Sequence, residues 1–266
     1  MIDSRQAAFL QEMGLGPVWS RRAPAPLPAS APETIAEAVN ALTTDSVTTF
    51  FDEPAVPVVE FASVPALQNG SDIAHMDWEQ LKAAVAPCTK CGLCKSRTQT
   101  VFGVGDQKAK WLFVGEGPGR NEDAQGLPFV GPAGKLLDNM LVAMGLKRGE
   151  NTYIANIVKC RPTDASRRDR PPEPAEANAC MPYLQRQIEL IDPAVIVALG
   201  KTAALSLLQL DPATPVGKLR GTVHRYAGKP LVVTYHPAYL LRTPGDKRKV
   251  WADLCLAMQS HDAAGK

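Results

Sequence analysis

The chain has 266 residues, is 45% hydrophobic and 21% charged, and carries a formal net charge of +2. This composition is typical of a globular protein. It contains no apolar run near the roughly 20 residues of a membrane helix, and six cysteines are too few for a secreted disulfide scaffold. The start of the sequence shows no signal-peptide pattern, so we expect a cytoplasmic protein without a membrane segment.

The small net charge conceals an uneven distribution. Residues 23–81 contain nine acidic residues and no Lys or Arg, whereas residues 82–266 contain 26 basic and 16 acidic residues. A basic body favours the binding of a polyanion such as DNA, because Lys and Arg contacts with phosphates release counterions. A solvated basic surface without such a partner is the alternative.

The first 75 residues divide into two segments. Residues 1–20 predict a short amphipathic helix, in which Phe9, Leu10 and Met13 share one face. Residues 21–75 are rich in Pro, Ala and acidic residues and predict a disordered linker. Residues 5–20 could dock a protein partner or fold back on the body, and the sequence leaves both open.

The rest of the chain predicts an α/β fold. Short apolar runs predict buried strands at residues 111–115, 153–158, 194–200 and 230–235. Helical patterns follow or precede them at residues 134–144, 174–191, 201–210 and 249–258. This alternation predicts a three-layer α/β/α domain over residues 76–260, with a central four-stranded, mostly parallel sheet, and a tail at 261–266.

Polar or glycine-rich residues lie near or just after the end of each predicted strand. They are the segment at 115–119, Asn156, the Gly-Lys pair at 200–201 and the His-Pro pair at 236–237. In open α/β sheets the ligand crevice lies at the carboxyl ends of the strands. The pattern therefore predicts a site at this edge, with ordinary strand–helix turns as the alternative.

Five of the six cysteines are candidates for a metal centre. A four-coordinate metal centre binds only four cysteines. We therefore predict the ligand set Cys88, Cys91, Cys160 and Cys180, with Cys94 as a spare or as a substitute for one of them. Four thiolates suit either a structural zinc or an iron–sulfur cluster. Only the first pair is closely spaced, which favours a 4Fe-4S cluster over zinc. The sixth, Cys255, is expected to be buried in an apolar helix.

Five blocks of sequence, together with the cysteine pattern, resemble the family 4 (iron–sulfur) uracil-DNA glycosylases. The blocks are Val-Phe-Gly-Val-Gly at 101–105, Gly-Glu-Gly-Pro-Gly-Arg-Asn-Glu-Asp at 115–123, Gly-Leu-Pro-Phe-Val-Gly-Pro-Ala-Gly-Lys at 126–135, Asn-Ile-Val-Lys-Cys-Arg-Pro at 156–162 and Thr-Tyr-His-Pro-Ala-Tyr-Leu-Leu-Arg at 234–242. The resemblance runs from about residue 78 to 258. It implies an enzyme that flips uracil out of single- or double-stranded DNA and hydrolyses its N-glycosidic bond, leaving an abasic site for base excision repair.

The resemblance also assigns roles around the base. It implies that Phe129 stacks on the flipped uracil and that Asn156 reads the edge of the base with one donor and one acceptor. It makes His236 the catalytic residue that donates a hydrogen bond to uracil O2 as negative charge develops there. Glu116 would help to position the site or a water. A core aromatic at 129 and a capping Asn at 156 are the alternatives.

Two further positions bear on substrate choice and mechanism. Gly117, in the substrate-binding loop, occupies the place of a water-activating Asp in family 1 enzymes, so we expect a dissociative path through an oxocarbenium ion and a uracil anion. Glu122 corresponds to the acid that fills the space of a thymine methyl group. Alternatively, Glu122 and Asp123 are acids favoured by a helix N-terminus.

The remaining predicted contacts are with DNA. Leu240 resembles the residue that wedges into the space left by the flipped base, and Arg242 would flank the DNA. Alternatively, Leu240 and Leu241 begin a buried helix, with one of the two exposed. Arg161, Arg167 and Arg168 lie in the loop between Cys160 and Cys180 and are expected to contact phosphates. That loop contains no His that could trap DNA covalently, so we expect turnover.

Two other function classes compete with the glycosylase hypothesis. One is a DNA-binding iron–sulfur protein with a redox or replication role and little or no glycosylase activity. The other is a nucleotide-binding module that uses the glycine-rich segment at 115–119, although this segment lacks the Lys-Ser/Thr of a P-loop. For the glycosylase we expect a monomer associated with the nucleoid.

Overall fold

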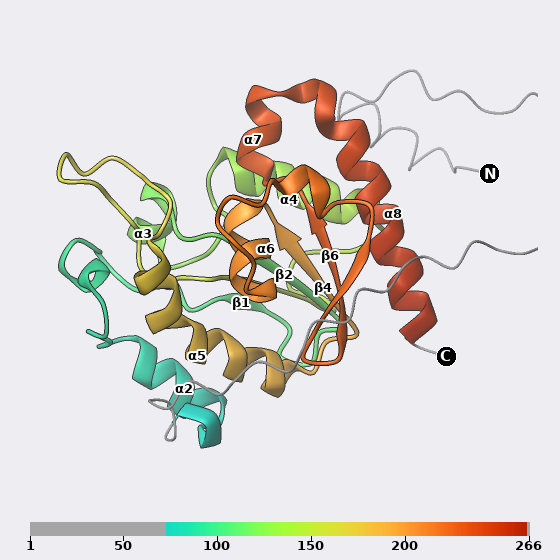
Figure 1. Cartoon of the computed structure of the whole chain (residues 1–266). Coiled ribbons are helices and arrows are strands. Elements are labelled where there is room, and N and C mark those ends of the chain that lie inside the picture. The colour runs from blue at the N-terminus through green and yellow to red at the C-terminus, as the bar shows by residue number, and fades with distance from the viewer. Residues whose placement is uncertain (1–72, 265–266) are drawn as a thin grey trace, which may run out of the picture.

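The computed structural model describes residues 73–264 (Figure 1). The predicted helix at 1–20 and the predicted linker from residue 21 up to residue 72 lie outside these residues. Within them, the chain folds around one six-stranded sheet in the order β1-β3-β2-β4-β6-β5. The strands are β1 (Val104–Gly105), β2 (Trp111–Gly115), β3 (Thr152–Asn156), β4 (Val195–Leu199), β5 (Val223–Tyr226) and β6 (Lys229–Thr234).

The centre of the sheet is parallel, as predicted. Strands β3, β2, β4 and β6 pair in parallel, and every residue of β2, β3 and β4 is buried. The prediction of four strands was incomplete, because β1 and β5 add an antiparallel strand at each edge. β1 has only two residues, and β5 places exposed Arg225 between buried His224 and Tyr226. Neither therefore shows the continuous apolar run by which a central strand is predicted.

Helices cover both faces of the sheet, which confirms the three-layer α/β/α architecture. One face packs against α2 (Trp78–Val85), α5 (Pro174–Ile191) and α6 (Lys201–Leu208), and the other against α4 (Pro132–Ala143), α7 (Pro237–Arg242) and α8 (Lys247–Ala264). Within β2, Leu112 and Val114 face the first set, whereas Trp111 and Phe113 face the second. Figure 1 shows α2 and α5 side by side, well away from α8.

Short helices complete the described part of the chain. They are α3 (Arg120–Gln125) and the 3-10 turns η1 (Ile73–His75), η2 (Gly92–Lys95), η3 (Val216–Lys218) and η4 (Pro244–Asp246). Ile73 of η1 is buried, so ordered packing begins in residues that the sequence assigned to the linker. None of the helices in residues 73–264 is long and apolar enough to cross a membrane.

The C-terminal helix differs from the prediction in two ways. α8 continues to Ala264, into the residues expected to form a tail. Cys255, expected to be buried, is only half-buried. The reason is helical periodicity, because the core-facing positions of α8 are Val250, Leu254 and Ala257, and residue 255 lies beside that face.

Candidate active site

The carboxyl ends of the four parallel strands meet at one edge of the sheet, as the sequence predicted. Gly115 at the end of β2 is in register with Asn156 at the end of β3. The backbone N–H of Gly200, after β4, donates to the carbonyl of Thr234 at the end of β6, at 2.8 Å. His236 follows two residues later. The fold therefore gathers the predicted polar residues at the switch-point edge where α/β proteins bind ligands.

Phe129 lies in the loop between α3 and α4 and faces this edge. Its ring centroid is 5.5 Å from that of His236, with an interplanar angle of 30°. A Cβ atom at Gly115 would lie 2.6 Å from Cζ of Phe129 and would also collide with Oδ1 of Asn156. Only glycine at position 115 lets the ring and the amide approach each other in this way. Phe129, Asn156 and His236 are thus brought together, as expected.

The side-chain amide of Asn156 is buried at the end of β3. Asn156 is 2% exposed, and its Oδ1 atom has no hydrogen-bond partner in the described part of the chain. A buried polar atom without a partner is costly and uncommon in folded proteins. Beside an aromatic ring and an imidazole, such an atom is suited to accept a hydrogen bond from a ligand.

His236 is held as a neutral hydrogen-bond donor. It caps the N-terminus of α7, where its Nδ1 accepts the backbone N–H of Ala238 at 3.1 Å. Since Nδ1 is the acceptor, the proton of the neutral ring is on Nε2. Burial lowers the pKa of His236 to about 4, and the positive charge of Arg242 contributes to this shift. At neutral pH the imidazole therefore presents an uncharged Nε2–H donor.

Glu116 follows β2 and is tied to the helix layer. Its Oε2 accepts a short hydrogen bond from Oγ1 of Thr202, in the first turn of α6. Burial raises the pKa of the Glu116 carboxyl, while this hydrogen bond opposes the shift. At the next position, Gly117, a Cβ atom would lie 2.7 Å from Cγ2 of Val158, so the loop packs tightly against the segment after β3.

Glu122 contacts the loop that carries Phe129. Its Oε1 accepts the backbone N–H groups of Val130 and Gly131, both at 2.9 Å. Its neighbour Asp123 is 3% exposed and accepts the backbone N–H of Thr98 at 2.9 Å. Both acids therefore hold neighbouring backbone segments. The prediction that Glu122 excludes a thymine methyl group stays a prediction.

The structure buries the residue expected to wedge into DNA, and the wedge itself stays a prediction. Leu240 is 1% exposed and packs in the core with Val250 and Leu254, because it lies on the inner face of α7. Leu241, on the outer side, is 47% exposed. The expectation that one of the two is exposed is confirmed, but the exposed one is Leu241. Arg242 is also exposed, and its Nη1 donates to the carbonyl of Ala238 at 2.9 Å.

The predicted basic loop after β3 is partly neutralised by its own acids. Arg161 pairs with Asp169 at 2.6 Å, and the exposed Arg168 pairs with Asp164 at 3.0 Å. Arg167 is exposed at the loop tip, in the left-handed backbone region with φ of 60°. These pairs order the loop, and a contact with phosphates would compete with them. The phosphate contacts stay predictions.

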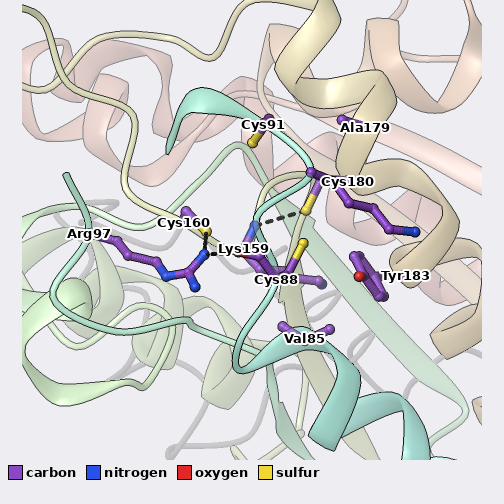
Figure 2. Close-up of a pocket in the computed structure, with 10 residues that line it drawn as sticks. Val85, Cys88, Cys91, Arg97, Lys159, Cys160, Ala179, Cys180 and Tyr183 are labelled. Carbon is purple, nitrogen blue, oxygen red and sulfur yellow. Dashed lines mark hydrogen bonds between the residues drawn. The ribbon is translucent and has the colours of Figure 1, made fainter. Parts of the chain in front are cut away.

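The four predicted ligand cysteines line one cavity, shown in Figure 2. Cys88 follows α2, Cys91 precedes η2, Cys160 follows β3 and Cys180 lies on α5, whereas Cys94 does not line this cavity. In residues 73–264 no three His, Cys, Asp or Glu side chains are placed to hold a single metal ion.

Two of these sulfurs accept hydrogen bonds. Nη1 of Arg97 donates to Sγ of Cys160 at 3.1 Å and to the carbonyl of Cys88 at 2.7 Å. The backbone N–H of Lys159 lies 3.3 Å from Sγ of Cys180. Such donors favour the thiolate form that a metal or cluster requires. The chemistry of this donor set, four thiols around one cavity with N–H groups directed at two of the sulfurs, fits a cluster held by four thiolates.

A buried polar chain connects the cysteine cavity with the candidate active site. Lys159 is 1% exposed, and its Nζ donates to Oε1 of Gln187 at 2.6 Å and to the carbonyl of Asn156 at 3.0 Å. Nε2 of Gln187 in turn donates to the carbonyl of Phe102 at 3.0 Å. Burial lowers the pKa of Lys159 to about 8. Lys159 therefore connects the end of β3 with Gln187 on α5.

Several of these polar residues were missed in the sequence. They are Arg97, Lys159, Gln187, Thr202 and Arg148, whose guanidinium donates to the carbonyl of Phe129. Lys159 lies within the block at 156–162, and Arg97 follows the third closely spaced cysteine by three residues, so both could have been singled out by position. Gln187 and Thr202 carry no such signal, because their partners are distant in the chain.

Fold and site together define a class: an α/β/α protein with an aromatic ring, a buried amide and a neutral imidazole at the carboxyl ends of parallel strands, together with a four-cysteine cavity. The family model of the uracil DNA glycosylase superfamily matches residues 102–255, more than half of the chain. The chain therefore belongs to the uracil-DNA glycosylase superfamily. Its identity to the relatives described next places it in the type-4 family of that superfamily.

Its similar relatives include three type-4 uracil-DNA glycosylases. The protein of Archaeoglobus fulgidus is 46% identical over 166 residues, which cover 60% of this chain and 81% of the relative. The protein of Thermotoga maritima is 46% identical over 62% of this chain and 83% of the relative. The protein of Pyrobaculum aerophilum is 40% identical over 68% and 93%, respectively.

Proposed function

We propose that this protein is a uracil-DNA glycosylase that flips uracil out of DNA and hydrolyses its N-glycosidic bond, leaving an abasic site that initiates base excision repair. The observation that carries the proposal is the buried Oδ1 of Asn156, which lacks a partner in residues 73–264 and lies beside Phe129 and His236. The similarity to type-4 uracil-DNA glycosylases supports the same reaction.

Base recognition follows from the amide and the ring. The flipped uracil stacks on Phe129, while Asn156 accepts the N3–H of uracil through Oδ1 and donates to O4 through Nδ2. Cytosine presents an acceptor at N3 and a donor at N4, so both contacts would be mismatched. Glu122, which accepts the backbone N–H groups of Val130 and Gly131, would fill the space that a thymine methyl group needs.

The leaving base carries the negative charge of the reaction. As the bond between C1′ and N1 breaks, its electron pair moves to uracil, and His236 donates Nε2–H to O2, where charge accumulates. Nδ1 of the neutral imidazole already accepts the backbone N–H of Ala238, so the proton of the ring lies on Nε2, the atom that donates to uracil. Water then adds to C1′ of the oxocarbenium ion, and the proton that this water loses balances the charge of the departing uracil anion, which leaves as neutral uracil. Glu116, anchored by Thr202, would orient the loop or that water.

DNA is held by residues around the pocket. We propose that Leu241, rather than the buried Leu240, enters the base stack when uracil leaves it. Arg242, Arg161, Arg167 and Arg168 would contact phosphates of single- or double-stranded DNA.

We further propose that Cys88, Cys91, Cys160 and Cys180 bind one 4Fe-4S cluster, with structural zinc as the alternative. When bound, the cluster would supply a structural crosslink between the segments that carry these cysteines. The chain's own contribution is to direct the donors of Arg97 and Lys159 at the sulfurs. Iron, sulfide and zinc analysis of anaerobically purified protein, with its visible spectrum, distinguishes the two.

The test of the function uses labelled single-stranded DNA that contains one uracil. Anaerobically purified protein is incubated with this DNA, and abasic sites are then cleaved with alkali. We expect strand cleavage only at uracil, with none in thymine or cytosine controls and none with a His236→Ala/Asn156→Ala variant. No cleavage by a folded, DNA-binding wild type would overturn the proposal. A stable protein–DNA adduct would contradict the expectation of turnover.

A further inference from the structure

Phe129 adopts an unfavourable backbone conformation. Its φ is 56°, in the left-handed region that residues with a Cβ atom rarely enter. Non-glycine residues persist there only where the surrounding structure holds them, and such positions cluster at functional sites. Contacts with neighbouring residues must therefore hold the backbone of Phe129 in this conformation.

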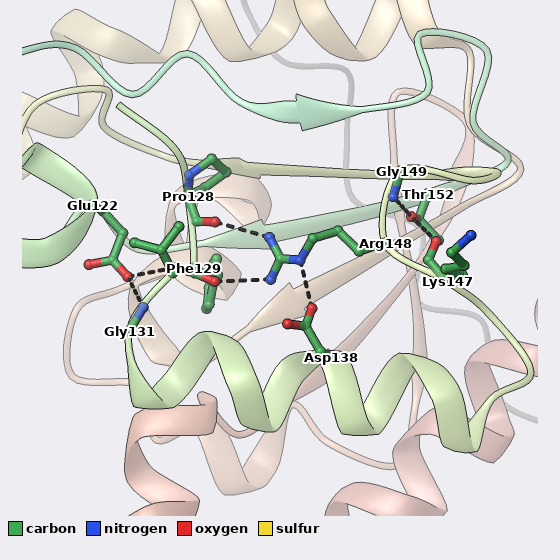
Figure 3. A network of polar contacts seen from close by, with 10 residues as sticks. Glu122, Pro128, Phe129, Gly131, Asp138, Lys147, Arg148, Gly149 and Thr152 are labelled. Atoms are coloured by element: carbon green, nitrogen blue, oxygen red, sulfur yellow. Dashed lines mark hydrogen bonds and ion pairs between the residues drawn. The ribbon is translucent and has the colours of Figure 1, made fainter. Parts of the chain in front are cut away.

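Arg148 holds the carbonyl groups of this segment, as Figure 3 shows. Its Nη1 donates to the carbonyl of Pro128 at 3.1 Å and its Nη2 to the carbonyl of Phe129 at 3.0 Å. Its Nε donates to Oδ1 of Asp138 on α4 at 2.6 Å. The planar guanidinium thus donates to two consecutive carbonyl groups, and its bond to Asp138 on α4 fixes its orientation. A lysine ammonium group does not reproduce this geometry.

The N–H groups that follow Phe129 are held by a second residue. Oε1 of Glu122 accepts from the next two backbone N–H groups, those of Val130 and Gly131. A Cβ atom at Gly134 would collide with the carbonyl of Phe129, so α4 also packs directly against this peptide. The peptide groups on both sides of Phe129 are therefore fixed by Arg148 and Glu122 from two different elements.

We infer that Arg148 is a positioning residue for base recognition: it locks the backbone of Phe129 in the left-handed conformation and so preforms the face on which the flipped base stacks. This inference rests on the proposed glycosylase function. Arg148 acts through Phe129, because its guanidinium bonds to carbonyl groups of the loop and to Asp138. A preformed ring avoids ordering the loop at the moment when the base arrives.

A purely structural role of Arg148 would have different consequences when the residue is replaced. The ion pair of Arg148 with Asp138 is partly exposed, with side chains 26% and 44% accessible, and such pairs contribute little to stability. If Arg148 only stabilised the fold, its loss would lower the melting temperature and act independently of the ring at position 129. If it positions the ring, its effect on rate requires the ring.

A double-mutant cycle separates these cases. Single-turnover rates on uracil-containing DNA are measured for the wild type, Arg148→Met, Phe129→Ala and the double variant. We expect Arg148→Met to slow the reaction on the order of 10- to 100-fold, the scale of a misplaced binding group. In the Phe129→Ala background, the same change should cost less than about twofold, since additivity fails for coupled residues.

Two further variants control for charge and folding. Lys147→Met removes a neighbouring cation that is 72% exposed and pairs with Glu150, and should leave the rate unchanged. Arg148→Lys keeps the charge but cannot span both carbonyls, and should lose part of the rate while the protein remains folded. A wild-type rate in Arg148→Lys, or equal penalties in both backgrounds, would overturn the inference. An inactive wild type would instead overturn the proposed function itself.

Discussion

The protonation state of His236 gives a prediction that can be worked out from the structure. Burial and Arg242 lower the pKa of His236 to about 4, whereas a histidine in an unfolded chain has a pKa of about 6.5. Between these values the unfolded state binds more protons than the folded state. The free energy of unfolding therefore falls as the pH falls from 6.5 towards 4. At about 1.4 kcal/mol per pKa unit, the full loss below pH 4 is about 3 kcal/mol.

Replacing the ring isolates this contribution. We expect the free energy of unfolding of wild type, relative to His236→Gln, to decrease by about 3 kcal/mol as the pH falls from 7 to 4. Urea unfolding at a series of pH values measures the difference. His75→Gln, which changes an exposed histidine, is the matched control and should keep the pH dependence of the wild type.

The same pKa bears on the reaction. Because His236 stays neutral down to about pH 4, the single-turnover rate should show no inflection near pH 6.5 that depends on this residue. An NMR titration of the His236 ring checks the assignment directly. A midpoint near 6.5, or identical pH dependence of unfolding in wild type and His236→Gln, would refute the reasoning.

Three other perturbations test the surroundings of the site. Gly115→Ala places a Cβ atom 2.6 Å from the Phe129 ring, so we expect a loss of single-turnover rate on the order of 10- to 100-fold; a rate near that of wild type would show that the ring can move freely. Lys159→Met leaves buried oxygens, including Oε1 of Gln187, without their donor, and should lower the free energy of unfolding by about 1–3 kcal/mol per oxygen in urea titrations; unchanged stability would contradict the buried chain. Arg97→Met removes a donor to a cysteine sulfur and should speed loss of the proposed metal centre to a chelator on the order of 10- to 100-fold, measured by absorbance; an unchanged rate of loss would show that Arg97 does not stabilise the centre.

Much of the fold followed from local sequence patterns. The four central strands are short, apolar and buried on both faces, so composition alone marks them. The edge strand β5 was not predicted because its exposed Arg225 interrupts the apolar pattern. The helix ends were predicted less accurately than the strands. The helix α8 extends to Ala264 because no residue in its polar last turns prevents helix formation.

The site was predictable only in part. Phe129, Asn156 and His236 follow or lie between strands in sequence blocks of a known family, and the structure brings them together. Leu240 and Leu241 are adjacent and chemically identical, so only the orientation of α7 decides which is exposed. The supporting residues Arg148 and Gln187 act through contacts 10 or more residues away in the chain, which no local pattern reports.

The most direct test of the proposed reaction is to identify both of its products. Duplex DNA with one uracil is incubated with wild type, and free uracil and abasic sites are both quantified by mass spectrometry. The account predicts equal amounts of the two, rising over many turnovers, and neither product with the His236→Ala/Asn156→Ala variant. Intact uracil-containing DNA after incubation with folded wild type would contradict it, as would products that persist in the variant.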